Sequence, residues 1–322
     1  MPATGPGTVP VVTVDLLITG TSGFVGSRVA AAAERQPGVR VRHLSRRTPP
    51  EAGPGAFVHG DLGDPPSLRG SCAGTDVLVH CATRIGGDAG TVEAMNDLGT
   101  RALVEEAVRA GVSRIVYVST AAVHGRGPFR GVRPGEVPIA PASATSRTRA
   151  AAERHVLDAG GLVLRPHLVY GEGDRWAVPG LVWLLGELST TALTGCAALQ
   201  SMIDVDSLGR AVVAAALSPA HDGGVHHVNH PEPVSVPDLL GAVGTLLEEP
   251  GGGAAVDVAT ALDRAAGKPL ALHHLGMLTV DHWFVDDAFW KDLDCSPGEG
   301  FAAEFRRAAP WYRSFLRGRR AS

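Results

Sequence analysis

Hydrophobic positions along the first half of the chain fall into two patterns. Short runs rich in valine, leucine and isoleucine recur between longer alanine-rich stretches with helical spacing. An apolar run without polar alternation is typical of a strand that is buried on both faces of a parallel sheet. The pattern predicts buried parallel strands at residues 12–19, 39–44, 56–59, 77–81, 115–119 and 162–165.

Helical patterns lie between these runs. Residues 24–35 and 92–110 carry apolar positions at helical spacing, and Gly111 is expected to end the second helix. Alternation of strands and helices predicts an α/β fold with a doubly wound parallel sheet, as in a Rossmann domain.

The pattern changes after Gly171 to short pieces separated by glycine and proline, with several tryptophans. We expect a dinucleotide-binding domain over residues 11–172, to which 202–230 return. A smaller C-terminal substrate cap and tail would come from 173–201 and 231–322. Residues 1–10 lack the features of a signal peptide and are expected to form a disordered leader.

A glycine-rich turn joins the first predicted strand to the first predicted helix. Its glycines let the backbone approach a pyrophosphate, and the helix N-terminus offers free N–H groups and a positive dipole end. Such a turn is a weak signal alone, but here a strand precedes it and a helix follows. We predict a dinucleotide site that includes Gly20, Ser22, Gly23, Phe24, Val25 and Gly26.

The second predicted strand is followed by Arg46 and Arg47, where an NAD site usually has an acidic residue that binds the ribose 2′-hydroxyl. Guanidinium groups form charge-assisted bonds with a 2′-phosphate. The sequence therefore favours NADP(H) over NAD(H), unless both arginines simply face solvent.

Further motifs extend the pattern, and together they resemble the extended short-chain dehydrogenase/reductases, in particular the NAD-dependent epimerase/dehydratase branch. The resemblance runs from about residue 12 to beyond Asp287. The motifs are TGxxGxxG, Gly60-Asp61-Leu62, Val79-His80-Cys81-Ala82, Asn96-x-x-Gly99-Thr100, Tyr117-Val118-Ser119-Thr120, Arg165-Pro166-His167-Leu168-Val169-Tyr170-Gly171, Ile203-Asp204-Val205-Asp206 and Asp286-Asp287-Ala288.

This resemblance implies roles for individual residues. Asp61 and Leu62 would lie at the adenine of the cofactor. The riboses would be lined by Cys81, Ala82 and Thr83. Pro166 and the residues after it would border the carboxamide.

The resemblance also exposes a departure at the catalytic positions. Thr120 occupies the family's serine or threonine position. Counting back from Glu153 places Arg149 at the family's lysine and Thr145 at its tyrosine. A threonine hydroxyl does not ionise near neutral pH, and arginine stays protonated. Neither residue can therefore supply the proton that the family's tyrosine supplies.

His124 and Tyr170 remain candidate proton donors. General acid catalysis is worth about 10²–10⁴-fold, whereas positioning the reactants is worth about 7–11 kcal/mol, so a reductase without the tyrosine is physically allowed. We hypothesise that a hydroxyl beside the carbonyl of the substrate supplies the proton.

The predicted cap carries Trp176 and Trp183 among aliphatic residues, which suits a large apolar substrate. A helix that packs its tryptophan and leucine residues into the core is the alternative explanation. The sequence combines this apolar cap with a missing proton donor and an arginine-rich composition. In these features it is similar to atypical ketoreductases that act on aromatic, angucyclinone-like polyketides. The substrate would be a polycyclic aromatic ketone. A sugar-nucleotide 4-ketoreductase and a catalytically silent NADP(H)-binding sensor are the alternatives.

Composition excludes other classes. The net charge of −4 gives no basic surface for nucleic acid, and no apolar run reaches the ~20 residues that span a bilayer. Four cysteines without CxxC spacing indicate reduced thiols in a cytoplasmic protein. The histidines at 226, 227 and 230 lack accompanying ligands at metal spacing, so no metal is expected. We expect a monomer or a homodimer.

Overall fold

A parallel sheet of seven strands organises the larger part of the chain in the computed structural model, which describes residues 13–47, 56–246 and 254–320. All six predicted strands are present and parallel, and a seventh comes from the returning segment 202–230. In spatial order the strands are β12 (Gly224–His227), β7 (Leu162–Arg165), β5 (Arg114–Val118), β4 (Val77–His80), β1 (Val14–Thr19), β2 (Val39–Ser45) and β3 (Phe57–His59).

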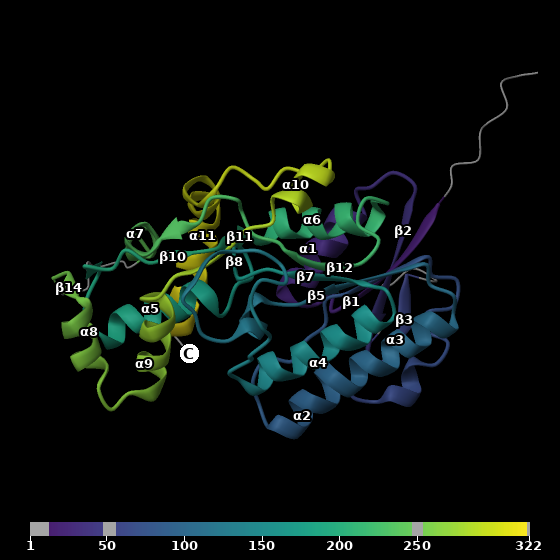
Figure 1. The fold of residues 1–322 in the computed structure, drawn as a ribbon, viewed down its shortest axis with the longest axis horizontal. Coiled ribbons are helices and arrows are strands. Elements are labelled where there is room, and N and C mark those ends of the chain that lie inside the picture. The colour runs from purple at the N-terminus through teal and green to yellow at the C-terminus, as the bar shows by residue number, and fades with distance from the viewer. Residues whose placement is uncertain (1–12, 48–55, 247–253, 321–322) are drawn as a thin grey trace, which may run out of the picture.

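Helices cover both faces of this sheet (Figure 1). Successive side chains of a strand point to opposite faces, so Leu16 and Ile18 of β1 enter one core while Leu17 enters the other. The first core is shared with α1 (Phe24–Ala33), α6 (Val205–Leu217) and α10 (Asp287–Asp292), and the second with α3 (Gly99–Arg109) and α4 (Ala144–Asp158). The predicted doubly wound α/β fold is confirmed.

The helix predicted at 92–110 is not continuous. It consists of α2 (Ala89–Glu93), a π-helical turn at Ala94–Leu98 and then α3. Within the wide turn, Asn96 accepts a hydrogen bond from the backbone N–H of Arg84 at 2.7 Å and donates to its carbonyl at 2.9 Å. The turn thus presents Asn96 to the loop after β4, a tertiary role that apolar periodicity does not reveal.

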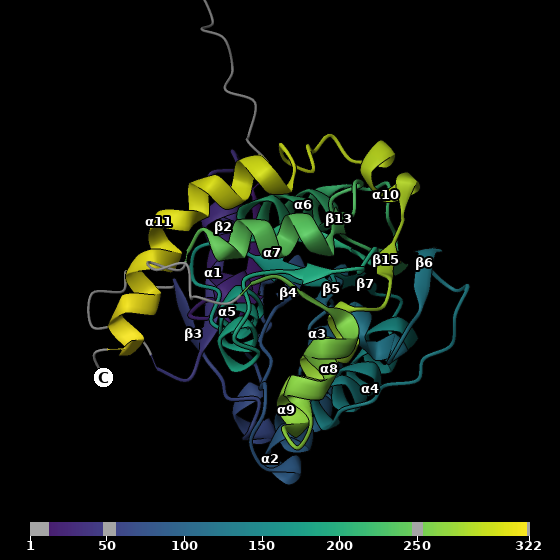
Figure 2. The ribbon, with the colours of Figure 1, turned by 90° about the vertical axis from the view of Figure 1, so that its left-hand side faces the viewer.

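A second core lies beside one end of the sheet (Figures 1 and 2). Its helices are α5 (Ala177–Glu187), α7 (Val236–Gly244), α8 (Val258–Ala265), α9 (Pro269–Leu278) and α11 (Phe301–Arg320). Short strands complete this region: β6 (Phe129–Val132), β8 (Leu168–Tyr170), β9 (Leu193–Thr194), β10 (Leu199–Gln200), β11 (Met202–Asp204), β13 (Val234–Ser235), β14 (Val256–Asp257) and β15 (His282–Phe284).

Two connections cross between the expected domains. Strand β6, from inside 11–172, joins the four-stranded sheet β13-β10-β15-β6. In the other direction, Phe289 of α10 is buried in the core of the central sheet. The two parts are therefore joined by packing as well as by the chain.

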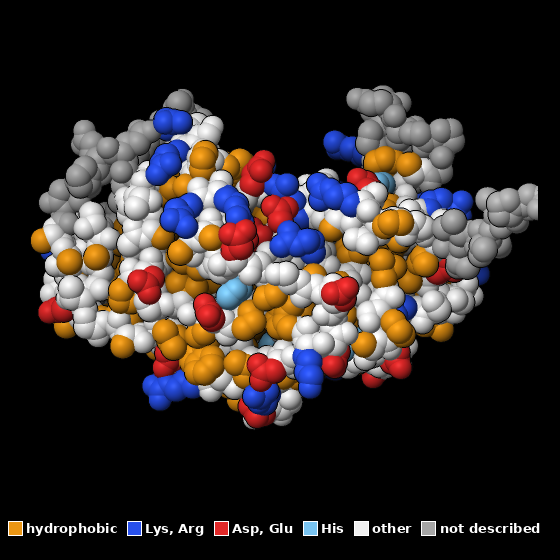
Figure 3. Space-filling model, turned by 90° about the horizontal axis from the view of Figure 1, so that it is seen from above, with side chains coloured by type: hydrophobic (Ala, Val, Ile, Leu, Met, Phe, Trp, Pro, Cys, Tyr) orange, Lys and Arg blue, Asp and Glu red, His pale blue; other side chains and the backbone are white. Residues whose placement is uncertain are grey.

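Acidic and basic side chains are interspersed on the surface that carries α6, α10 and α11 (Figure 3). Ion pairs such as Arg28–Asp206 and Arg307–Glu304 account for part of this pattern. Among the residues that the structure describes, no helix is both long and apolar enough to cross a bilayer. The predicted leader lies outside the described residues.

Candidate active site

The glycine turn between β1 and α1 leaves no room for side chains. Gly20 has φ +73°, and a Cβ there would lie 2.7 Å from the backbone of Ala82. A Cβ on Gly26 would lie 2.1 Å from the carbonyl oxygen of Gly20. The backbone of the turn thus packs directly on α1 and on the loop after β4, and Gly23 stands at the N-terminus of the helix.

Hydrogen bonds fix the end of β4 below this turn. Thr19 Oγ1 accepts from the N–H groups of Cys81 and Ala82, so its own proton goes to His80 Nδ1, 2.6 Å away. His80 Nε2 then donates to Thr100 Oγ1 at 2.9 Å. Burial lowers the pKa of His80 to about 3. His80 is therefore a neutral structural residue.

A cleft of about 220 Å³ opens above the turn. Arg46 is exposed at its edge and forms no ion pair within the described part of the chain, whereas Arg47 lines a neighbouring groove. Cys81 does not line the cleft; its side chain packs against the core. The predicted cofactor residues that do line it are Gly20, Ser22, Gly23, Arg46, Asp61, Leu62, Ala82 and Thr83.

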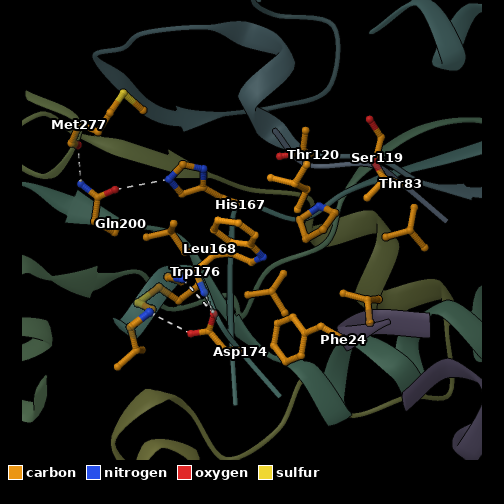
Figure 4. Close-up of a pocket in the computed structure, with 18 of the residues that line it drawn as sticks. Phe24, Thr83, Ser119, Thr120, His167, Leu168, Asp174, Trp176, Gln200 and Met277 are labelled. Carbon is orange, nitrogen blue, oxygen red and sulfur yellow. Dashed lines mark hydrogen bonds between the residues drawn. The ribbon is translucent and has the colours of Figure 1, made fainter. Parts of the chain in front are cut away.

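A second cavity, of about 640 Å³, adjoins the cleft and shares Gly23 and Thr83 with it (Figure 4). Most of its wall is apolar, with contributions from Phe24, Val25, Ile85, Pro166, Leu168, Trp176, Val178, Leu181, Met202, Met277 and Leu278. Its polar side chains are Thr83, Ser119, Thr120, Arg149, His167, Asp174, Gln200 and His274.

Two of the three predicted catalytic positions lie in this cavity. Thr120 and Arg149 both line it. Arg149 donates through Nη2 to the carbonyl of Val118 at 2.7 Å, and its Nε is buried without a partner in the described structure. Thr145 does not line the cavity, and its Oγ1 lies 3.5 Å from the backbone nitrogen of Gly86.

Helix α4 is held in place by a buried polar network. Glu153 accepts two hydrogen bonds from Arg165, at 2.9 and 2.6 Å, and one from Ser119. Both charged residues are almost fully buried. Because Arg149 stands one turn before Glu153 on the same helix, the network also fixes where Arg149 enters the cavity.

The two candidate proton donors proposed from the sequence do not line the cavity. Tyr170 is buried against Phe301, and burial raises the pKa of its phenol far above the ordinary value. His124 is buried, with Nδ1 3.1 Å from the carbonyl of Pro138. The other two tyrosines of the chain, Tyr117 and Tyr312, are also fully buried. No tyrosine of this chain therefore faces the cavity.

Of the two tryptophans expected at the substrate, only Trp176 lines the cavity, with 62% of its surface exposed. Asp174 accepts hydrogen bonds from the backbone N–H groups of Trp176 and Ala177, which fixes the start of α5. Trp183 lies outside the wall, with its ring 5.8 Å from that of His274. Trp183 follows Leu181 by two residues, so it lies on the face of α5 turned away from the lining residues Val178 and Leu181.

Sequence reasoning missed Gln200, and it included His167 only in the segment after Pro166, without a role of its own. Both side chains line the cavity, and His167 Nε2 lies 3.4 Å from Gln200 Oε1. The position of His167 directly after Arg165-Pro166, at the carboxyl end of β7, was a usable signal, since ligands of α/β sheets bind at that edge. Gln200 carries no such signal, because it reaches the site from the small sheet.

Comparison with known proteins agrees with the fold. The model of the NAD dependent epimerase/dehydratase family matches residues 16–229, so the chain belongs to this family. It is an NAD(P)-dependent oxidoreductase of the short-chain dehydrogenase/reductase type.

Individual relatives are more distant. A 2-alkyl-3-oxoalkanoate reductase of Stenotrophomonas maltophilia is 27% identical over 91% of this chain and 97% of its own. A 4-hydroxy-2-methyl-3-oxo-4-farnesyl-3,4-dihydroquinoline-1-oxide ketoreductase of Stigmatella aurantiaca is 32% identical over 51% of this chain and 53% of its own. Among solved structures, MoeE5 in complex with UDP-glucose and NAD shares the fold, with a TM-score of 0.71 and 22% identity over 94% of this chain and 99% of its own.

Proposed function

We propose that this protein is an NADP(H)-dependent ketoreductase that reduces a carbonyl of a polycyclic aromatic ketone, in the biosynthesis of an angucyclinone-like polyketide antibiotic. In pattern it resembles the angucyclinone ketoreductase of simocyclinone biosynthesis. The observation that carries the proposal is the cavity itself. It is large and mainly apolar, it adjoins the dinucleotide cleft, and it contains Thr120 and Arg149 but no tyrosine.

The residues of the cleft fit a dinucleotide. Gly20 and Gly26 keep side chains out of the turn, and no side chain caps the start of α1, so N–H groups there are available to bind a pyrophosphate. Arg46 at the edge of the cleft would bind a ribose 2′-phosphate, which favours NADP(H). When bound, the reduced nicotinamide supplies a hydride.

In the proposed reaction, the protein positions the ketone and stabilises the charge that develops on its oxygen. The Thr120 hydroxyl donates a hydrogen bond to that oxygen, and the guanidinium of Arg149 contributes a fixed positive charge from the same wall. The carbonyl oxygen then takes the proton of a hydroxyl beside it on the substrate. The resulting phenolate is reprotonated by water.

Turnover of matched ketones tests this proposal. We expect NADPH to be consumed faster with 8-hydroxy-1-tetralone, whose hydroxyl lies beside the carbonyl, than with 1-tetralone. Equal rates would exclude protonation by the substrate. If none of the aromatic ketones tested causes NADPH to be consumed, the assigned substrate class is excluded.

A second candidate is the reduction of an aliphatic 3-oxo acid. It is favoured by the similarity to the Stenotrophomonas reductase along nearly the whole chain. Arg149 would then bind the carboxylate. A 2-alkyl-3-oxoalkanoate in the same assay separates the two. The alternatives from the sequence give other results: a sugar-nucleotide reductase is stabilised by nucleoside diphosphates, and a sensor binds NADPH without consuming it.

A further inference from the structure

His167 and Gln200 form a small polar unit inside the apolar cavity (Figure 4). The side-chain nitrogen of Gln200 lies within hydrogen-bonding distance of three backbone carbonyls, those of Met277 at 3.5 Å, Leu278 at 3.2 Å and Val280 at 2.9 Å. Carbonyls only accept hydrogen bonds, so they fix the amide with its NH₂ toward them. The oxygen of Gln200 must therefore face His167.

This orientation determines the tautomer of His167. Because the Gln200 oxygen is an acceptor, Nε2 of His167 must carry the proton of the contact between them. In the neutral ring, Nδ1 then has a free lone pair. Nδ1 has no hydrogen-bond partner among the described residues, and the ring lines the cavity.

The surroundings keep His167 neutral. Its ring stacks on that of His282, with centroids 5.6 Å apart and an angle of 7° between the planes. His282 is itself fixed as a neutral ring, since it contacts the carbonyl of Val280 through Nδ1 and accepts from the N–H of Gly127 through Nε2. Burial, and then His282, lower the pKa of His167 to about 3.

We propose that Nδ1 of His167 accepts a hydrogen bond from a hydroxyl group of the substrate and thereby selects hydroxyl-bearing ketones. This inference rests on the proposed function and narrows its substrate class. His167 has no proton on Nδ1 to give, so it binds the substrate without acting as the acid. Gln200 is a positioning residue that sets the tautomer. A ligand without the hydroxyl leaves the lone pair buried and unpaired, which reduces kcat/KM by about 10- to 100-fold.

The tautomer is measured without any substrate. In the full-length protein with NADP+ and ¹⁵N-labelled histidine, NMR of the ring nitrogens is expected to show a neutral His167 with its proton on Nε2. His167→Phe assigns the signal. In Gln200→Met the ring is expected to populate both tautomers. A proton on Nδ1 in the unmodified protein, or no tautomer change in Gln200→Met, overturns the inference.

Selection is measured with hydroxy-1-tetralones that carry the hydroxyl at position 5, 6, 7 or 8 and with their methoxy counterparts. At least one hydroxy compound is expected to exceed its methoxy partner by about 10- to 100-fold in kcat/KM. His167→Phe should abolish this preference, and the same substitution at His274, a second histidine of the cavity, should leave it intact. A preference that survives His167→Phe, or is lost in both variants, contradicts the inference.

Failure of the proposed function gives a different result. If no tetralone consumes NADPH, the ketoreductase assignment fails, but the increase in Tm caused by each compound in the presence of NADP+ still reports binding. A larger increase with the hydroxy compound, lost in His167→Phe, supports the acceptor role. If the hydroxy compound raises the Tm equally in the unmodified protein and in His167→Phe, the acceptor role of His167 is overturned.

Discussion

Glu153 of α4 and Arg165 of β7 form a buried, bidentate ion pair. The pair lies at the edge of the central sheet next to the cavity. Removing one partner leaves the other charge unpaired in the interior. We expect Glu153→Gln to lower the free energy of unfolding by about 3 kcal/mol in urea titrations. The double variant Glu153→Leu/Arg165→Met should recover most of this loss. A double variant no more stable than Glu153→Gln would show that the pair as a whole stabilises the fold.

Cofactor preference is expected to depend on Arg46. Arg46→Ala should raise the KM for NADPH by about 10- to 100-fold, because a charge-assisted contact with the 2′-phosphate is lost, and should leave the KM for NADH nearly unchanged. Steady-state kinetics with both cofactors measure this. Arg47→Ala is the matched control and is expected to have a smaller effect, because Arg47 lines the neighbouring groove. Equal increases for NADPH and NADH would mean that Arg46 does not contact the 2′-phosphate.

Restoring the family's catalytic pair should remove the need for a proton from the substrate. In Thr145→Tyr/Arg149→Lys, we expect the kcat for 1-tetralone to rise by at least about 10-fold, because a positioned acid is worth about 10²–10⁴-fold. The kcat for 8-hydroxy-1-tetralone should change little. Thr145→Phe/Arg149→Lys keeps the ring without the phenol and serves as control. If both variants behave alike, the missing tyrosine does not limit the reaction.

Acid should destabilise the fold through His227. Both of its ring nitrogens are buried without a partner in the described structure, and burial, followed by the charges of His124 and Arg165, lowers its pKa to about 3. The unfolded state, with a pKa near 6.5, binds the proton first, so the free energy of unfolding falls as the pH drops from about 6.5 toward 3. At pH 5 this one group accounts for about 2 kcal/mol.

His227→Phe removes that loss and also the unpaired nitrogens. We expect the variant to gain about 1 kcal/mol at pH 7 and about 2 kcal/mol more at pH 5, measured by urea unfolding. The ring of Phe284, 4.8 Å away, offers an aromatic neighbour to the new side chain. The same substitution at the exposed His59 is the control. A variant with the same pH dependence as the unmodified protein would exclude His227 as the source.

The fold was predictable because its information is local. A strand buried on both faces must be apolar throughout, and the turn after β1 must contain glycine where Ala82 and Gly20 approach it closely. The assignment of Arg149 and Thr145 to the family's catalytic positions depends on their spacing from Glu153 along one helix, and it stays a prediction. Within the predicted strands and helices of the central sheet, periodicity missed local irregularities such as the π-helical turn at Ala94–Leu98.

By itself, then, the sequence determined the parallel sheet and the glycine turn after β1, because each depends mainly on neighbours along the chain. The tertiary structure alone decided which side chains share the cavity. It placed Trp176 inside and Trp183 outside, buried Tyr170 and His124, and brought Gln200 to His167. Those contacts join segments far apart in sequence, and their geometry depends on how the cap packs against the sheet, which no local pattern encodes.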